Sequence, residues 1–355
     1  MKRIVLTIAI IATLCLTGCG TLKDKDIRNS FLKDVEGLKS YYMEGTLKIT
    51  NNDDTYEYNV EVCYKKDNKY KVSLKNKAND YEQIILKNDD GVYVITPSLN
   101  KSFKFQSDWP DNNSQSYLLD SVANDLKNDS AYKFTQKDKN YIFTTKTNYP
   151  NNPQYVKQNI IIDSNRKLQK VEVQDENGVT YIEFTPKTID NRAKFNDSQF
   201  SLEEVTKNFS DNSEMAEEES KENNNNTDTN TEDNNTESTS KIDETIFPLY
   251  LPTNTTLSDK EVISTENGER VIMTFSGDNP FVLVEETVKP SQNLEIIPTY
   301  GEPFMLVDAV GSLTDTSYTW TSGGVEYYIV SDQMNKNELL EVAKSINVVS
   351  AINQK

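Results

Sequence analysis

The stretch FKFQSDWPDNNSQSYLLDSVANDL, residues 103–126, passes from a strand pattern to a helix pattern across a polar turn. Pro110 cannot donate to a strand ladder, and the polar residues after it are typical of turns and helix N-caps. The residues that follow predict an amphipathic helix over 115–127. Its apolar stripe consists of Leu118, Leu119, Val122, Ala123 and Leu126.

Strand patterns dominate the segments on both sides of this helix. In TYEYNVEVCYK, residues 55–65, apolar and aromatic side chains alternate with polar ones, as in an antiparallel strand with one buried face. Roughly ten such runs follow one another, and a sheet that wide curls and needs a cover over its concave face. The sequence therefore predicts a mainly β (α+β) fold with a curved antiparallel sheet. The other runs lie at residues 70–74, 81–87, 91–96, 101–105, 131–135, 140–147, 158–163, 168–174 and 179–184.

A second amphipathic helix is predicted before the strands, at residues 27–42, where Phe31, Val35 and Leu38 recur at helical spacing. We expect both helices to lie on the curled sheet, so that the helix at 115–127 forms a lid over the concave face. Two interpretations of this lid remain open, a packed part of the core and a mobile gate over a lipid cavity. The residues assigned to the lid or cavity are Trp109, Pro110, Tyr117, Leu118, Leu119, Val122 and Leu126.

Residues 246–355 have the pattern of a small α+β domain. Residues 318–332 predict a hairpin that turns at Gly323 and Gly324. We assign Trp320, in this hairpin, to the core rather than to a ligand platform. The other predicted elements are strands at 269–276, 280–287 and 302–308 and a helix with the apolar stripe Leu339, Val342, Ala343 and Ile346.

An acidic segment, residues 211–245, separates the two folded parts and carries 12 acidic and 2 basic side chains. Because it has almost nothing to bury, it cannot offset the entropy of ordering, and we predict a disordered linker. The predicted folded domains are then residues 19–210 and 246–355. Neither of them carries the basic surface that nucleic acid requires, so no nucleic-acid partner is expected.

The N-terminus predicts a lipid-anchored protein. A positive start precedes an apolar run at residues 4–16, which is too short for a membrane span of about 20 residues and fits a signal-peptide core. The run ends in LTGC, which resembles the lipobox of bacterial lipoproteins. This resemblance implies that residues 1–18 are a lipoprotein signal peptide, cleaved between Gly18 and Cys19, and that Cys19 carries a diacylglycerol and anchors the chain to the membrane. An ordinary secretory signal with a chance cysteine is the alternative.

The residue types limit the available chemistry. The chain has no histidine, which removes Ser-His and Cys-His catalysis and most zinc sites. Cys63 has no intrachain disulfide partner, and strand alternation places it on the polar face. Adjacent acidic residues are assigned to solvated surface, because neighbours on a strand point to opposite faces. We therefore predict no catalytic residue, no cofactor and no metal. The adjacent acidic pairs are Asp53-Asp54, Asp89-Asp90, Glu203-Glu204 and Glu285-Glu286.

One stretch resembles a known family. GVYVITPSLNKSFKFQSDWPDNNSQSYLLDSVANDLKND, residues 91–129, is similar to the YdcC-like and clostridial GerS-like sporulation lipoproteins of Firmicutes, which belong to the LolA/LolB/RseB superfamily. The likeness covers about residues 27–205 and implies an unclosed β-barrel with helices on its concave side. In that superfamily the concave cavity receives lipoprotein acyl chains or forms a protein-sensing surface. Residues 300–347 resemble a small domain of the DUF4367 type, which implies no chemistry.

These observations favour a non-catalytic envelope lipoprotein over an enzyme. The family resemblance implies a role in envelope remodelling during sporulation or germination, with a cortex or cell-wall hydrolase as a possible partner. The alternative is a carrier or sensor that holds an acyl chain in the concave cavity. The expected location is the outer face of the cytoplasmic membrane, or a forespore membrane in sporulating cells.

Overall fold

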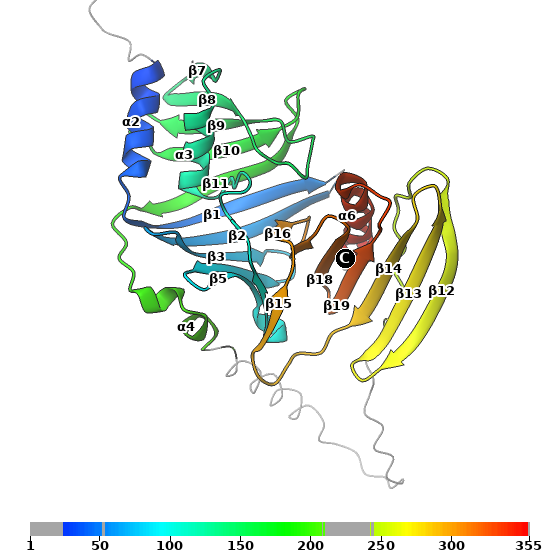
Figure 1. The fold of residues 1–355 in the computed structure, drawn as a ribbon. Helices are drawn as coiled ribbons and strands as arrows, with labels where there is room; N and C mark the ends of the chain where they lie inside the picture. The colour runs from blue at the N-terminus through cyan, green and yellow to red at the C-terminus, as the bar shows by residue number, and fades with distance from the viewer. Residues whose placement is uncertain (1–23, 52–53, 208, 210–241, 243–244, 354–355) are drawn as a thin grey trace, which may run out of the picture.

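The computed structural model describes residues 24–51, 54–207, 209, 242 and 245–353. The signal peptide, Gly18, Cys19 and nearly all of the acidic segment lie outside these ranges. Two sheets make up most of the described chain, and the prediction of a mainly β fold with an unclosed curved sheet is confirmed (Figure 1).

The first sheet has 12 strands in the order β15-β6-β5-β4-β3-β2-β1-β11-β10-β9-β8-β7, and its two edge strands do not meet. Ten of the neighbouring pairs are antiparallel, while β15 joins β6 in parallel. Its strands are β1 (Ser40–Asn51), β2 (Asp54–Lys65), β3 (Lys69–Asn76), β4 (Glu82–Asn88), β5 (Gly91–Thr96), β6 (Lys101–Phe105), β7 (Lys133–Lys137), β8 (Asn140–Lys146), β9 (Lys157–Asp163), β10 (Leu168–Gln174), β11 (Thr180–Asp190) and β15 (Glu295–Thr299).

The first predicted helix ends earlier than expected. Helix α2 spans Asp24–Glu36, and β1 begins at Ser40, so the predicted helical extension to residue 42 is wrong. Tyr41 and Met43 are fully buried on alternate positions of β1, and that period-two burial outweighs the helical spacing that ends at Leu38. Gly45 lies in this strand where a Cβ would stand 2.7 Å from the Phe184 ring, so it allows close packing on β11.

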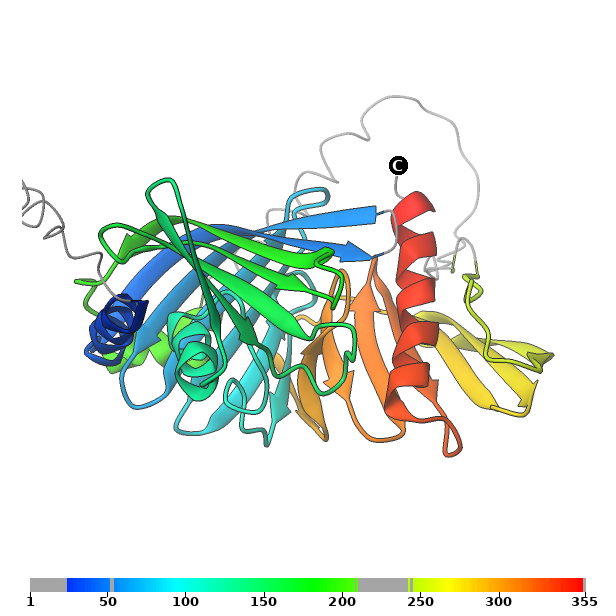
Figure 2. The same cartoon turned by 90° about the horizontal axis from the view of Figure 1, so that it is seen from above.

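Two helices lie inside the curve of the first sheet, as predicted (Figure 2). Helix α3 spans Leu119–Asn128, four residues shorter at its start than expected, and buries Leu119, Val122 and Leu126. The Arg28 guanidinium of α2 donates to the backbone carbonyls of Leu126 and Lys127, each at 2.9 Å. These bonds satisfy carbonyls at the end of α3 and join the two helices.

The convex face of the first sheet is also partly covered. Helices η2 (Asp197–Phe200) and α4 (Leu202–Thr206) cross β4 and β5, and the buried Phe200 packs with Ile84, Leu86 and Ile95. Cys63 packs against this cluster and is half-buried, so its assignment to a wet polar face is wrong. Burial raises the pKa of the Cys63 thiol.

The second sheet has seven strands in the order β12-β13-β14-β19-β18-β17-β16, with helix α6 (Lys336–Asn353) against β18 and β19. The predicted hairpin at Gly323 and Gly324 is confirmed, and Trp320 is buried between the rings of Tyr318 and Tyr327. The sequence prediction missed β12, β15 and β17. The strands are β12 (Thr255–Thr265), β13 (Gly268–Gly277), β14 (Phe281–Thr287), β16 (Glu302–Met305), β17 (Val310–Leu313), β18 (Ser317–Ser322) and β19 (Val325–Val330).

Glu285 is fully buried on β14, so its assignment to solvated surface is wrong. Its carboxylate accepts the backbone N–H of Ile246 at 3.0 and 3.3 Å, while Lys260 supplies the nearby positive charge. Burial raises the pKa of Glu285 to about 7. The folded protein therefore binds more protons than the unfolded chain between about pH 4.5 and 7, and its stability falls as the pH rises through that range.

We expect Glu285→Gln to flatten this pH dependence and to raise the free energy of unfolding at pH 8 by about 1–3 kcal/mol. The amide keeps an acceptor for the Ile246 N–H and carries no buried charge. Urea melts at pH 5 and pH 8 measure the effect, with the exposed Glu261→Gln as the matched control. Equal pH dependence in wild type and Glu285→Gln would show that this carboxylate is not desolvated.

Candidate functional site

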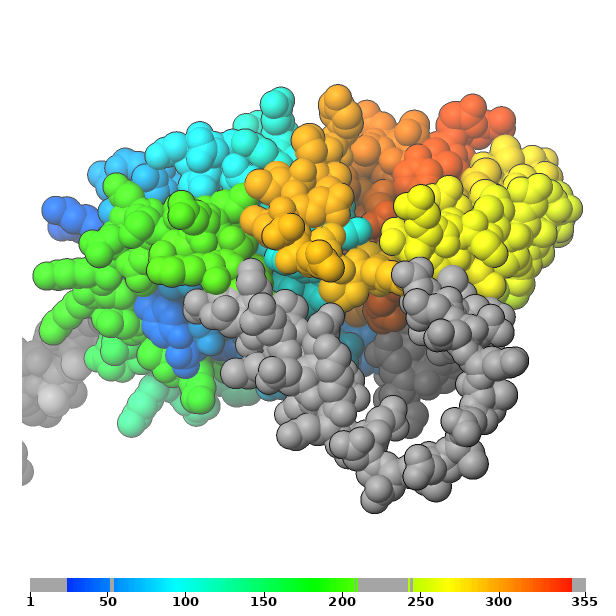
Figure 3. Space-filling model, turned by 90° about the horizontal axis from the view of Figure 1, so that it is seen from below, coloured from blue at the N-terminus to red at the C-terminus, as the bar shows by residue number. Residues whose placement is uncertain are grey.

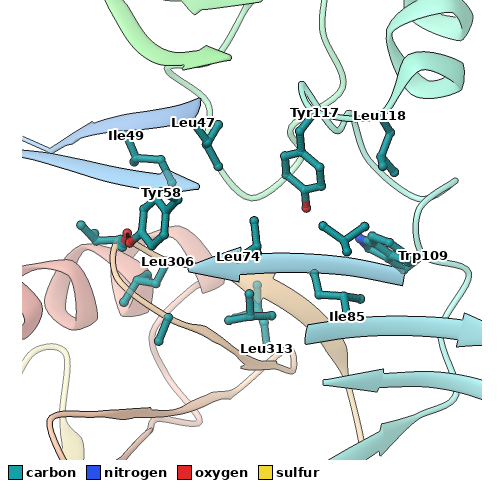
Figure 4. Packing of buried hydrophobic residues seen from close by; sticks show 14 of the residues in the cluster. Leu47, Ile49, Tyr58, Leu74, Ile85, Trp109, Tyr117, Leu118, Leu306 and Leu313 are labelled. Carbon is teal, nitrogen blue, oxygen red and sulfur yellow. Dashed lines mark hydrogen bonds between the residues drawn. The ribbon is translucent and has the colours of Figure 1, made fainter. Parts of the chain in front are cut away.

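The stretch from Trp109 to Tyr117 lies beside the first sheet, the start of helix α3 and the C-terminal part of the chain. Trp109 is 1% exposed, and its ring meets the ring of Tyr70 edge-on at 5.7 Å. The ammonium of Lys87 donates to the Trp109 carbonyl oxygen. Figure 4 shows Tyr117 pointing toward the strand of the first sheet that carries Leu74, with Trp109 and Leu118 beside it.

Asp120 fixes the start of α3 on the sheet. Its two carboxylate oxygens accept hydrogen bonds from the hydroxyls of Tyr41 and Tyr70, and the Tyr41 hydroxyl also accepts the Leu119 backbone N–H at 3.3 Å. Burial raises the pKa of Asp120, and the two phenol donors oppose that shift. A helix held by these bonds and by a buried stripe is a fixed part of the core in this structure.

Within the described part of the chain, the concave face retains small cavities: one of about 80 Å³ beside Tyr41 and Asp120, and one of the same volume at the end nearest the C-terminal part of the chain. Of the predicted lid residues, Trp109 and Tyr117 line this second cavity, together with Leu47, Ile182 and Leu306. Leu118, Leu119, Val122 and Leu126 are buried beside it in the core and do not line it, and Pro110 is buried at the turn. Binding pockets for small molecules are usually about 300–1,000 Å³, so each of these cavities is too small for a long acyl chain.

Buried hydrogen bonds hold the C-terminal unit, residues 245–353, against the half-barrel unit, residues 24–209. The Gln83 side chain donates to the Val310 carbonyl at 3.0 Å and accepts the Val310 N–H at 2.6 Å. The Tyr58 hydroxyl donates to the Val307 carbonyl at 2.6 Å. Both units contribute to one continuous buried cluster, so the boundary between them is an apolar interface.

Strand β15 makes the second connection between the units. It leaves the C-terminal unit and pairs over residues 295–299 with β6, which is the outermost strand contributed by the half-barrel unit on that side. Figure 3 shows this orange segment between the half-barrel unit and the rest of the C-terminal unit. Close by, Glu302 accepts a hydrogen bond from the Asn112 amide at 2.6 Å and another from the Ser107 hydroxyl. The turn around Trp109 therefore also links the two units.

A larger cavity, of about 360 Å³, lies at this junction and is open to solvent on one side. Its walls come from β4, β5, β6 and β15 on one side and from β17, β18 and β19 on the other. Its volume falls within the usual range for binding pockets. Of its lining residues, Trp320 alone is a candidate site residue in the sequence. Gln83, a polar residue inside an apolar strand run, and the apolar run at 296–298 were the signals that could have indicated it.

Among the described residues, acidic and cysteine side chains do not gather into a metal site. In that part of the chain, no group of three or more Cys, Asp or Glu side chains is placed to hold a metal ion. None of the described helices is long and apolar enough to cross a membrane. The Asp89 carboxylate, one of the adjacent acidic residues, forms an exposed ion pair with Lys69 at 3.1 Å, which is surface chemistry.

The fold and junction define a two-unit protein built on an open β half-barrel, with a filled concave side. The chain belongs to the YdcC-like family of sporulation proteins: the family model matches residues 1–200. The curated sporulation protein YdcC of Bacillus subtilis is 34% identical over 347 residues, which cover 97% of this chain and 96% of that protein.

Solved structures with weaker likeness include a crystal structure of MucB, 12% identical, which covers 93% of this chain and 98% of that chain with a TM-score of 0.31. A LolA superfamily protein from Nitrosomonas europaea is 12% identical, with coverage of 52% and 99% and a TM-score of 0.30. The Clostridioides difficile CwlD amidase complex with the GerS lipoprotein gives 15% identity, coverage of 50% and 98%, and a TM-score of 0.20. At these scores the likeness adds nothing to the architecture described above.

Proposed function

We propose that this chain is a lipid-anchored, non-catalytic protein of the cell envelope that binds a protein partner during sporulation or germination. Membership of a family of sporulation proteins supports a role during sporulation or germination. The LTGC sequence at residues 16–19 supports an anchor at Cys19 on the outer face of the cytoplasmic membrane or a forespore membrane. A cortex or cell-wall hydrolase is the partner class that fits envelope remodelling.

The filled concave face favours a protein partner over an acyl chain. The face carries fully buried side chains such as Tyr41, Met43 and Val62, and α3 and the turn at Trp109 close over them. Among the described residues, the cavities on this face are of about 80 Å³ each. A carrier would have to move α3 and expose its four buried aliphatic side chains to make room, which costs about 25 cal/mol for each Å² of apolar surface exposed.

Mass spectrometry of lipids extracted from the purified full mature chain tests this proposal. We expect acyl chains only on the peptide that begins with Cys19 and no free lipid in molar ratio to the protein. Crosslinking in sporulating cells, followed by identification of a protein bound in defined stoichiometry, is the supporting result. One extractable acyl lipid per chain, without any crosslinked protein, would overturn the proposal in favour of a carrier.

The proposed lipid anchor at Cys19 leads to a separate prediction. We expect Cys19→Ala to release the protein into the medium or to leave it uncleaved, because nothing else in the sequence suggests attachment. Fractionation and blotting measure the distribution, and Cys63→Ala, which changes a thiol on β2, is the control. Salt-resistant membrane binding of a cleaved Cys19→Ala chain would exclude this anchor.

A further inference from the structure

The junction cavity has two chemically different walls. The wall from the first sheet and β15 is mostly apolar: it includes Val94, Phe103, Phe105, Ile297 and Pro298, with Gln83 and Thr299 as its polar members. Phe103 is only partly buried, so its ring is available to a ligand. Such a wall favours an aromatic or branched aliphatic group.

The opposite wall belongs to the second sheet and is polar. Thr321 and Glu326 are direct cross-strand partners on β18 and β19, and Thr319 lies two residues before Thr321 on the same face. Among the described residues, no hydrogen bond or ion pair reaches the Glu326 carboxylate or the hydroxyls of Thr319 and Thr321. Two hydroxyls and one carboxylate therefore face the cavity without partners in the described chain.

The charges around Glu326 leave its carboxylate unmatched. Lys101 and Arg270 are the nearby cations, and Glu286 and Glu295 are the nearby anions. The Arg270 guanidinium is 2.7 Å from Glu286, and the Lys101 ammonium is 3.9 Å from Glu295. Two cations face three carboxylates, so an added cation is favoured at Glu326.

The mouth of the cavity has the features of a protein-binding surface. Tyr300, which lines the cavity, is 90% exposed, and Ile296, which is 48% exposed, lies on β15 next to the lining residue Ile297. The sequence from residue 246 to 355 carries 15 acidic and 6 basic side chains, so the surrounding field attracts a basic partner. Exposed apolar side chains around a pocket, with a charged rim, are typical of interface hot spots.

We propose that this cavity receives an apolar side chain of a protein partner, and that a lysine or arginine next to it in the partner pairs with Glu326. This inference rests on the proposed function, because it specifies where the protein partner binds and with which chemistry. The apolar anchor packs on Phe103, Ile297 and Pro298, and the cation meets the carboxylate on the polar wall. A plain acyl chain would leave those two hydroxyls and the carboxylate desolvated and unpaired, which is unfavourable.

Two fluorescein-labelled peptides, Lys-Leu-Phe-Lys and Glu-Leu-Phe-Glu, test the inference by fluorescence anisotropy with the full mature chain in detergent. We expect the lysine peptide to bind at least tenfold more tightly than the glutamate peptide. Glu326→Gln should raise the Kd of the lysine peptide about tenfold, since it removes the paired charge and keeps the side-chain shape. Glu261→Gln, the same change on exposed β12, should alter the Kd less than twofold.

A second variant, Thr319→Phe, fills the cavity from the polar wall and should abolish binding of the lysine peptide, with circular dichroism confirming the fold. Equal affinity for both peptides, no binding of either, or no response to Glu326→Gln would each overturn the inference. Binding of a fluorescent fatty acid that Thr319→Phe blocks and Glu326→Gln leaves unchanged would also overturn it and assign the cavity to lipid. Failure of the peptides to bind leaves the proposed function standing, because lipid extraction and crosslinking test that function separately.

Discussion

Leu119→Ala should lower the free energy of unfolding by about 2–5 kcal/mol, and Val122→Ala should lower it by a smaller amount. Leu119 is 4% exposed and Val122 is 1% exposed, and both lie on the face of α3 that closes the concave side of the first sheet. Truncation leaves a cavity that α3 cannot fill by moving, because Asp120 and the bonds from Arg28 hold both ends of the helix. Thermal and urea melts of the mature chain measure the change.

Asn124→Ala is the matched control, because Asn124 is exposed on the same helix and should change the stability by less than about 0.5 kcal/mol. The competing interpretation, a mobile gate over a lipid cavity, makes the opposite prediction. In that case Leu119→Ala would leave the melts almost unchanged while uptake of a fluorescent fatty acid rises. The fixed ends of α3 and the small concave cavities favour the loss of stability.

The sequence predicts the elements whose pattern is local. Alternation in residues 55–65, the hairpin at Gly323 and Gly324, and the helical stripe from Leu118 to Leu126 each depend on neighbours in the chain. The structure contains all three. Burial of Trp109 also follows from local sequence, since a tryptophan at the exit of a strand beside a helix lies over the core.

The missed features depend on contacts between distant parts of the chain. Strand β1 contains Tyr41 and Met43 directly after a helical pattern, and only its pairing with β2 and β11 shows that the pattern has changed. Strand β15 is five residues long and contains a proline, which is acceptable because it is an edge strand. Its parallel pairing with β6 joins residues almost two hundred positions apart, and no local periodicity encodes that contact.

The sequence pattern also fails to predict which polar residues are buried. The adjacent pair Glu285-Glu286 predicts solvated surface, because neighbours on a strand point to opposite faces, yet Glu285 is fully buried and its carboxylate accepts the Ile246 backbone N–H. Gln83 is also a buried polar residue, in an apolar strand run. Its burial is favourable because its side-chain amide hydrogen-bonds to both the backbone N–H and the backbone C=O of Val310. A polar residue inside a strongly apolar strand is thus a sequence signal for an interface, although the sequence does not identify its partner.

The contacts between the half-barrel unit and the C-terminal unit lead to the second prediction with a large expected effect. A protease site inserted in residues 211–245 should yield two fragments that remain bound to each other after cleavage. The predicted domain boundaries provide the cutting site, while β15, Gln83 and Tyr58 supply contacts that do not depend on an intact connection. Size-exclusion chromatography of the cut protein should give one peak that contains both fragments. Separate peaks would mean that the contacts between the two units do not hold them together without the covalent connection.

Gln83→Leu should weaken this association strongly, because it leaves the buried N–H and C=O of Val310 without partners. Each unsatisfied group costs about 1–3 kcal/mol, so the dissociation constant of the cut fragments should rise by about 30-fold or more. Leucine has nearly the volume of glutamine, so the change removes hydrogen bonds and adds no cavity. Gln169→Leu, on an exposed position of β10, is the matched control and should leave association unchanged. An unchanged dissociation constant for Gln83→Leu would mean that water or another polar group reaches Val310, and that β15 and the apolar contacts alone hold the units together.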